Sequence, residues 1–118
     1  MSEFVLLYRS TPEAHHEAMG TPERAQKSME KWRHWMNDMT QKGQLKNIGQ
    51  PLQRSGSVVR GRAKSVTDGP YIETKEALGG YSVIDADSAD EAVDIAKTWP
   101  GVDRGWITIE VRPVLEMG

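Results

Sequence analysis

The segment from Thr21 to Gly43 constrains the fold most, because it carries a helix start, a helix stop and one apolar face. Thr21 can cap free backbone N–H groups, and Pro22 suits the first helical turn. Gly43 marks the end, since glycine adopts the left-handed C-terminal conformation at little cost. Apolar side chains recur between these signals every three or four residues: Ala25, Met29, Trp32, Met36 and Met39. This spacing predicts one long helix that buries one face against the rest of the chain.

Strand-like segments lie on both sides of this helix. "FVLLYR" (4–9) is a short apolar and aromatic run that suits a central strand. It ends in a polar stretch, "STPEAHHE", which we expect to be a loop. "LKNIGQPL" (45–52) has moderate strand character, but Gly49 and Pro51 favour an edge or a bulge over a central position.

The second half of the chain repeats this pattern. "GYSVIDA" (80–86) predicts a strand, and Ser88 with Glu91 three residues later forms a capping box that starts a second helix. That helix is expected to stop at "WPG" (99–101), because proline cannot continue it. "WITIEVRPV" (106–114) then alternates as a closing strand. One face of that strand would carry Trp106, Thr108, Glu110 and Arg112.

A further segment, "GSVVRGRAKSV" (56–66), indicates a pair of short strands or one bent strand. The order is therefore strand, helix, strand, hairpin insertion, strand, helix, strand. This is the ferredoxin-like split βαβ pattern of an α+β protein. A chain of 118 residues has room for a single domain, which we place at 1–118.

In such a fold both helices cover one face of the antiparallel sheet. The other face, with Trp106 and Arg112, must be solvated, lined by a ligand or covered by a second subunit. A tryptophan there argues against water alone.

Composition excludes several classes of protein. A net charge of −2 and 27% charged residues are those of an ordinary globular protein and favour no nucleic-acid partner. The absence of cysteine excludes disulfides, thiol redox chemistry and Cys-ligated metals. No apolar run is long enough for a membrane helix or a signal peptide, so we expect a cytoplasmic protein.

The stretch "TDGPYIETKEALGGY" (67–81) identifies a family. Together with "KGQL", "GQPL" and "IEVRPV", it resembles the YCII-related family in its DGPF-motif branch, over nearly the whole chain. The resemblance implies a ferredoxin-like subunit that pairs sheet to sheet into a dimeric α+β barrel. It also implies a cleft between the sheet and the insertion.

The sequence departs from that family at two positions. Members of the wider family carry a histidine in the first helix and an aspartate near the exit of the second, which have been proposed as a catalytic pair. The position corresponding to the histidine holds Trp32, and the second helix exits through "WPG". A His/Asp mechanism therefore has no matching residues here.

The family motif offers few groups for chemistry. Asp68 begins an Asp-Gly-Pro turn, where its carboxylate accepts backbone hydrogen bonds, and it is also our candidate acid or base if burial raises its pKa. Gly79 and Gly80 lack the spacing of a phosphate-binding loop and fit a tight entry into the strand at Tyr81.

The histidines do not suggest a metal site. His15 and His16 are adjacent in the polar stretch, and the helical i,i+4 pairing that ligates zinc is missing, so we expect no metal and no cofactor.

Two hypotheses remain. In the first, the chain is a homodimeric module that binds a small molecule or a partner at the uncovered sheet face, with Tyr71, Tyr81, Trp106 and Arg112 as ligand-binding residues. In the second, it is a cofactor-free isomerase, lyase or hydrolase in which Asp68 is the acid or base and Arg112 anchors an anionic group. The missing His/Asp pair favours the first hypothesis.

Overall fold

A computed structural model describes residues 2–69 and 77–116. The described elements, in chain order, are β1 (Ser2–Ser10), α1 (Pro12–Met19), α2 (Pro22–Gln41), β2 (Leu45–Asn47), β3 (Gly56–Arg60), β4 (Ser65–Gly69), β5 (Ala77–Ala86), α3 (Ala89–Lys97), α4 (Pro100–Asp103) and β6 (Thr108–Pro113). Four strands form one sheet in the order β2-β5-β1-β6, and β3 pairs with β4 in a separate two-stranded sheet. All recorded strand pairs are antiparallel. The expected α+β ferredoxin-like fold is therefore confirmed.

The predicted helix signals act where the sequence places them. The Thr21 hydroxyl accepts a hydrogen bond from the Arg24 N–H at 3.1 Å, which caps α2. The same helix ends at Gln41, and Gly43 just after it has a φ of 70°, in the left-handed region. At α3, Ser88 accepts from the Glu91 N–H at 3.1 Å and starts the helix as predicted.

Two helices were not predicted. The stretch expected to be a polar loop is α1, so His15 and His16 lie on an exposed helical surface instead. Its start repeats the chemistry of α2, because the Thr11 hydroxyl accepts from the Ala14 N–H at 3.1 Å and Pro12 follows the cap. The other is α4, a single short turn that Pro100 begins just after the expected stop of α3.

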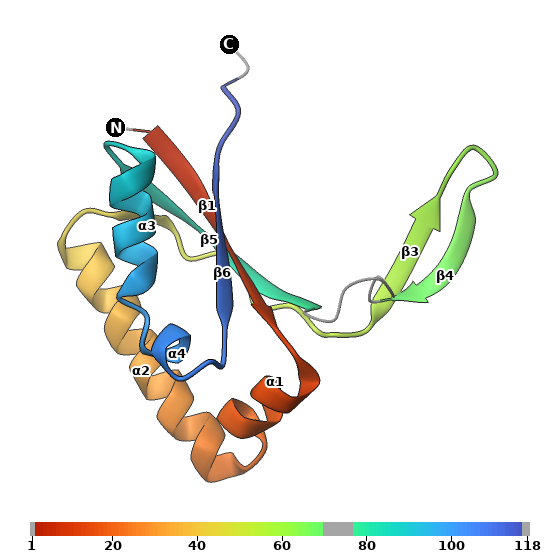
Figure 1. The fold of residues 1–118 in the computed structure, drawn as a ribbon, viewed down its shortest axis with the longest axis horizontal. Coiled ribbons are helices and arrows are strands. Elements are labelled where there is room, and N and C mark those ends of the chain that lie inside the picture. Colours follow the sequence, from red (N-terminus) through yellow and green to blue (C-terminus); the bar gives the residue numbers. More distant parts are fainter. Residues whose placement is uncertain (1, 70–76, 117–118) are drawn as a thin grey trace.

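The core lies between the sheet and two helices. Figure 1 shows α2 and α3 on the same side of the four-stranded sheet, as predicted. The buried side chains come from β1 (Phe4, Leu6, Tyr8), β5 (Ile84, Ala86), α2 (Trp35, Met36, Met39) and α3 (Ala92, Ile95, Ala96). Of the apolar stripe predicted for α2, Met29 is 39% exposed, whereas Trp35 outside that stripe is buried.

An aromatic cluster fills one end of this core. The ring centroids of Tyr8 and Trp32 are 5.0 Å apart, and those of Trp35 and Trp99 are 5.3 Å apart. The Trp35 indole N–H donates to the Thr98 hydroxyl at 2.7 Å, so this buried polar group is satisfied. Burial raises the pKa of Tyr8, and the neighbouring Ser82 hydroxyl offsets only part of that effect.

The predicted hairpin insertion is present. Strands β3 and β4 form a two-stranded ribbon, which we call the arm (residues 56–69). Figure 1 shows the arm extending away from the rest of the chain, on the side of the sheet opposite to α2 and α3. None of the helices in the described part of the chain is long and apolar enough to span a membrane.

Candidate functional site

The sheet face turned away from α2 and α3 is not covered by any described helix, and we call it the open face. Side chains alternate along a strand, so the neighbours of the buried Phe4, Leu6 and Tyr8 point to this face. The open face comprises Glu3, Val5, Leu7 and Arg9 of β1, Leu78, Tyr81, Val83 and Asp85 of β5, and Thr108, Glu110 and Arg112 of β6. It therefore has an aliphatic centre between charged groups.

The strand register arranges these side chains in rows across the sheet. Leu7 lies between Tyr81 and Glu110. In the next row, Val5 lies between Val83 and Arg112. Side chains directly opposite one another on neighbouring strands are in contact range, so each row combines an aliphatic centre with a charged residue on β6.

The charged residues form one network. Arg9 Nη2 lies 3.3 Å from Glu110 Oε1, and Arg112 Nε donates to the other carboxylate oxygen of Glu110. The hydrogen bond from Arg112 is the main cause that lowers the pKa of Glu110, and Arg9 lowers it further. Two guanidinium groups share one carboxylate, which leaves this part of the open face with a net positive charge.

Local packing at glycines sets the position of Tyr81. The pairing of β1 with β5 shifts between Tyr8 and Arg9, so that Gly79 is the extra residue of a bulge just before Tyr81. Gly49 packs directly against the Tyr81 backbone, because a Cβ built there would lie 1.7 Å from the Tyr81 carbonyl oxygen. The segment around Gly49 thus runs along β5 at the edge of the sheet. Gly49 and Pro51 in "LKNIGQPL" had indicated such an edge position.

The structure places two predicted site residues on the open face, Tyr81 and Arg112, on the strands to either side of β1. Tyr71 lies outside the described residues. The expectation that Trp106 lies on the sheet is wrong, because β6 begins only at Thr108. Trp106 lies in the preceding loop, where the Arg104 guanidinium carbon is 5.2 Å from its ring centroid. Its ligand-binding role stays a prediction.

Asp68 lies on the arm near the end of β4, and Pro70 of the predicted Asp-Gly-Pro turn lies outside the described residues. It is part of β4, directly opposite Ser57, because the hairpin pairing extends to Gly69. Its side chain is exposed, so it does not lie in the buried environment expected of an acid–base carboxylate. Figure 1 places β4 apart from the sheet that carries Arg112, and a single chain does not bring these two candidates together.

Sequence reasoning missed Arg9 and Glu110 as site residues. They are 101 positions apart in the chain, and they meet only because β1 and β6 are neighbours in the sheet. Part of this charge network could be predicted, since the alternation of "WITIEVRPV" places Glu110 and Arg112 on the same face of the strand. The residue on β1 could not be chosen without the register between the two strands.

Two grooves lie on the helical side instead. One has a volume of about 310 Å³ and lies between α2 and the residues that follow α3, where His34 Nε2 is 3.5 Å from Asp38 Oδ2. It is lined by Glu30, Lys31, His34, Trp35, Asp38, Thr98 and Pro100. Within the described ranges, no cluster of His, Asp or Glu has an arrangement that could hold a metal ion.

Comparison with known proteins identifies the family of this chain. The model of the YCII-related domain matches residues 2–118. The chain belongs to the YCII-related domain family. An uncharacterised protein from Rhizobium meliloti is 45% identical to this YCII-related chain over 49 residues, which cover 42% of the chain and 40% of the relative. The matched segment thus spans less than half of that relative's length.

The structure shows what the side chains do at the two positions where this YCII-related chain departs from the family pattern. Trp32, at the position that the resemblance assigns to a histidine, packs its ring against Tyr8 and Trp99. Trp99, at the exit of the second helix, is 5% exposed in the same cluster. Trp99 is therefore a core side chain and the partly buried Trp32 packs against the core, and neither offers an acid or a base.

Proposed function

We propose that this chain is a homodimeric binding module, in which two open faces pair and enclose a cleft for a small anionic molecule. The observation that carries the proposal is the composition of the open face. Val5, Leu7 and Val83 form an aliphatic centre on a sheet face that the described part of the chain leaves uncovered. Antiparallel sheets commonly expose one face to water, but such a face is then polar.

A second copy of the chain, packed through the same face, is the simplest way to bury the open face. Paired sheets lie about 10 Å apart and interdigitate their inner side chains, which would bury both aliphatic centres. A two-fold axis would place the same residues on both sides of the interface. The charged residues Arg9, Glu110 and Arg112 would then surround an apolar middle, which is the usual anatomy of an interface.

The charge network favours an anionic ligand. Arg9 and Arg112 share Glu110, so one positive charge in this network is not balanced within it. Arg112 has a side chain that is 61% exposed and is the better placed of the two to bind a carboxylate or phosphate. Tyr81, in the adjacent row, would contact the apolar part of such a ligand.

The catalytic alternative has less support. It needs Asp68 as an acid or base beside Arg112, but Asp68 is exposed on the arm. Trp99 is buried and Trp32 packs against the core, so neither position supplies an acid or a base for the other candidate pair. Binding without catalysis is therefore our proposal.

The homodimer predicts the effect of a charge at the centre of the open face. The unaltered chain should sediment as a dimer at micromolar concentration, and Leu7→Lys should weaken dimerisation by about 100-fold or more, because two lysines would meet in an apolar interface. Val93→Lys, at a 39% exposed position on α3, is the matched control and should remain dimeric. Sedimentation equilibrium measures both. A dimer that Leu7→Lys leaves intact would contradict pairing through this face.

The ligand is tested separately. We expect benzoate, as a probe with a carboxylate and an apolar ring, to raise the melting temperature of the unaltered chain by roughly 3 °C at saturating concentration. Arg112→Ala should abolish this shift, whereas Arg33→Ala, at an exposed position on α2, should retain it. Differential scanning calorimetry with benzoate and with inorganic phosphate makes the measurement. Equal shifts in both variants would remove Arg112 from the binding site.

A further inference from the structure

The arm has no extensive packing against the other described elements of the chain. Among the described elements, β3 and β4 pack extensively only on each other. Val59 and Val66 lie directly opposite one another and are 64% and 65% exposed. Isolated two-stranded hairpins are marginally stable in water, so the arm needs a covering surface to keep its shape.

The arm leaves the sheet at one defined end. Arg54, just before the arm, donates to the carbonyl oxygen of Ser10 at 3.0 Å and to its hydroxyl at 3.2 Å. Ser10 is buried at the last position of β1, where it pairs with Ala77. The arm is thus attached at the Ser10 end of the sheet and extends on the side of the open face (Figure 1).

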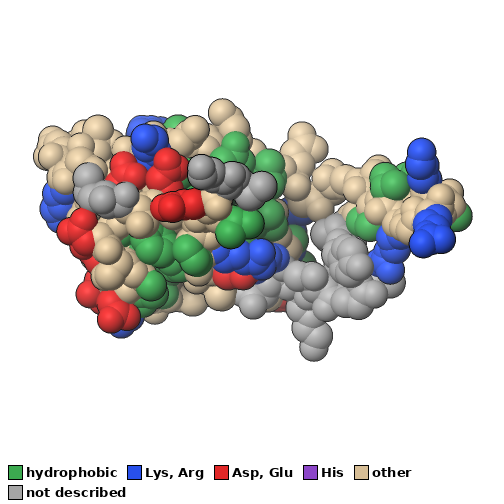
Figure 2. Space-filling view, turned by 90° about the horizontal axis from the view of Figure 1, so that it is seen from above, with side chains coloured by type: hydrophobic (Ala, Val, Ile, Leu, Met, Phe, Trp, Pro, Cys, Tyr) green, Lys and Arg blue, Asp and Glu red, His purple; other side chains and the backbone are tan. Residues whose placement is uncertain are grey.

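The tip of the arm is basic. Arg62 and Lys64 are exposed in the turn between β3 and β4, and Figure 2 shows Lys and Arg side chains gathered on the arm. Lys64 has a φ of 54°, the one positive value at a residue other than glycine in the described part of the chain. Glycine or asparagine would fit that turn conformation with less strain.

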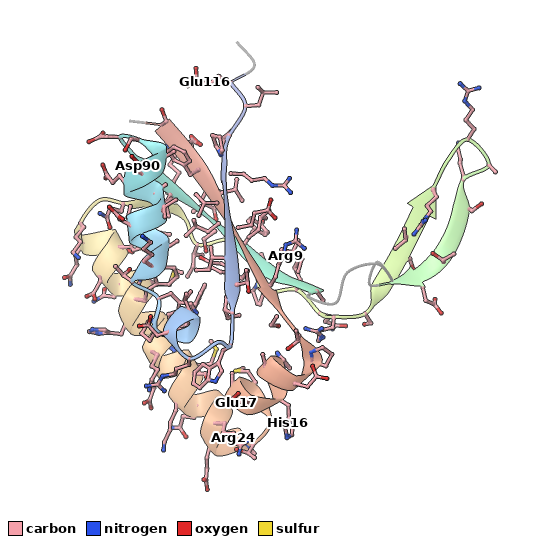
Figure 3. The ribbon with its side chains drawn as sticks, in the orientation of Figure 1. Arg9, His16, Glu17, Arg24, Asp90 and Glu116 are labelled. Atoms are coloured by element: carbon pink, nitrogen blue, oxygen red, sulfur yellow. The ribbon has the colours of Figure 1, made fainter. Side chains whose placement is uncertain are left out.

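The opposite end of the open face is acidic. Glu3 and Asp85 lie directly opposite one another on β1 and β5, next to the pair of Ser2 with Ala86. Like charges in this position repel, and none of the ion pairs recorded among the described residues includes either carboxylate. Asp90 on α3 lies at the same end of the molecule (Figure 3), and Figure 2 shows Asp and Glu gathered there. Within the described part of the chain, the carboxylates of Glu3 and Asp85 thus have no ion-pair partner.

We infer that the arm of each chain lies on a second copy, with Arg62 and Lys64 against Glu3 and Asp85 of that copy. The inference rests on the proposed homodimer, and it adds the direction in which the two sheets pair. A two-fold axis that runs across the strands places the Ser10 end of one sheet over the Ser2 end of the other. The basic arm then meets the acidic end twice in each dimer, and Val59 and Val66 gain a surface that covers them.

Charge reversal on each side of the contact tests the inference. Arg62→Glu with Lys64→Glu should weaken dimerisation by about tenfold or more at low salt, because attraction is replaced by repulsion in both contacts. Glu3→Lys with Asp85→Lys should have a similar effect. Mixed in equal amounts, the two variants should form a mixed dimer of nearly unaltered affinity, since each reversed arm then meets a reversed acidic end. Sedimentation equilibrium at low and high salt makes the comparison.

A matched control carries the same change of charge elsewhere. Arg24→Glu with Lys27→Glu alters exposed positions of α2, on the helical side, and should leave dimerisation unchanged. Circular dichroism of each variant verifies its fold. Arg62→Gln with Lys64→Gln removes the charges without reversing them, so this variant should weaken the dimer less than the charge reversal does.

The outcomes separate the two proposals. A monomeric unaltered chain would overturn the homodimer and the arm contact together. A dimer that neither reversed pair weakens at low salt would overturn the arm contact alone. Weakened variants that do not recover on mixing would overturn the assigned acidic partner, since the arm would then bind elsewhere.

Discussion

Gly49→Ala is expected to lower the free energy of unfolding by about 3 kcal/mol, since it combines backbone strain with a steric clash. Gly49 has a φ of 74°, which an alanine adopts only at a cost. An added Cβ would also lie 1.7 Å from the carbonyl oxygen of Tyr81 and 2.7 Å from its carbonyl carbon, so the edge segment would have to move away from β5. Urea unfolding at a fixed protein concentration measures the loss.

Gly43→Ala is the matched control for this prediction. Gly43 has nearly the same φ, 70°, but nothing lies within 4 Å of a Cβ built there. Only backbone strain remains, so we expect a loss of about 1 kcal/mol. Equal losses in the two variants would show that the contact with Tyr81 has no energetic role.

Trp35→Ala is expected to cost about 3 to 5 kcal/mol, the usual range when a buried aromatic side chain is removed. Trp35 is 4% exposed, and its ring contacts those of Tyr8, Trp32 and Trp99. No single neighbour can fill the space that its indole leaves. The same urea experiment measures the loss, and near-ultraviolet circular dichroism reports whether the remaining rings keep their packing.

Smaller substitutions separate ring packing from the hydrogen bond. Thr98→Val leaves the Trp35 N–H without its acceptor at 2.7 Å, which should cost about 1 to 2 kcal/mol. In a chain that already carries Trp35→Phe, the same change of Thr98 should cost less, because there is no N–H to satisfy. A cost of Thr98→Val that is identical in both backgrounds would exclude this hydrogen bond as a source of stability.

Local signals predicted most of the fold. Helix ends depend on residues that are close in the sequence, so they can be predicted from it. Examples are the caps at Thr21 and Ser88 and the left-handed glycine at position 43. The short helix α1 was not predicted because its apolar face is weak. Its start signal, Thr11 followed by Pro12, is nevertheless the same as that of α2. The error at Trp106 has another cause, since the alternating pattern of β6 extends beyond its hydrogen bonds to β1.

The candidate site was less accessible to sequence reasoning. Tyr81 and Arg112 were named because their strands are clearly periodic, and both lie on the open face. Arg9 acquires its role only through the register between the first and last strands. Asp68 was placed at the start of a turn because Asp-Gly-Pro is typical of turns, and only the structure shows that it pairs with Ser57 in β4. Distant pairings of this kind depend on tertiary structure.

The aromatic cluster determines what light spectroscopy can report on this chain. Three of the four tryptophans, Trp32, Trp35 and Trp99, have ring centroids within 5.6 Å of one another, close enough for excitation energy to pass between them. Tryptophan emission will therefore monitor mainly the interior between sheet and helices. Events on the open face should be nearly silent in that signal, and tyrosine absorbance at Tyr81 is the better optical reporter for a ligand bound there.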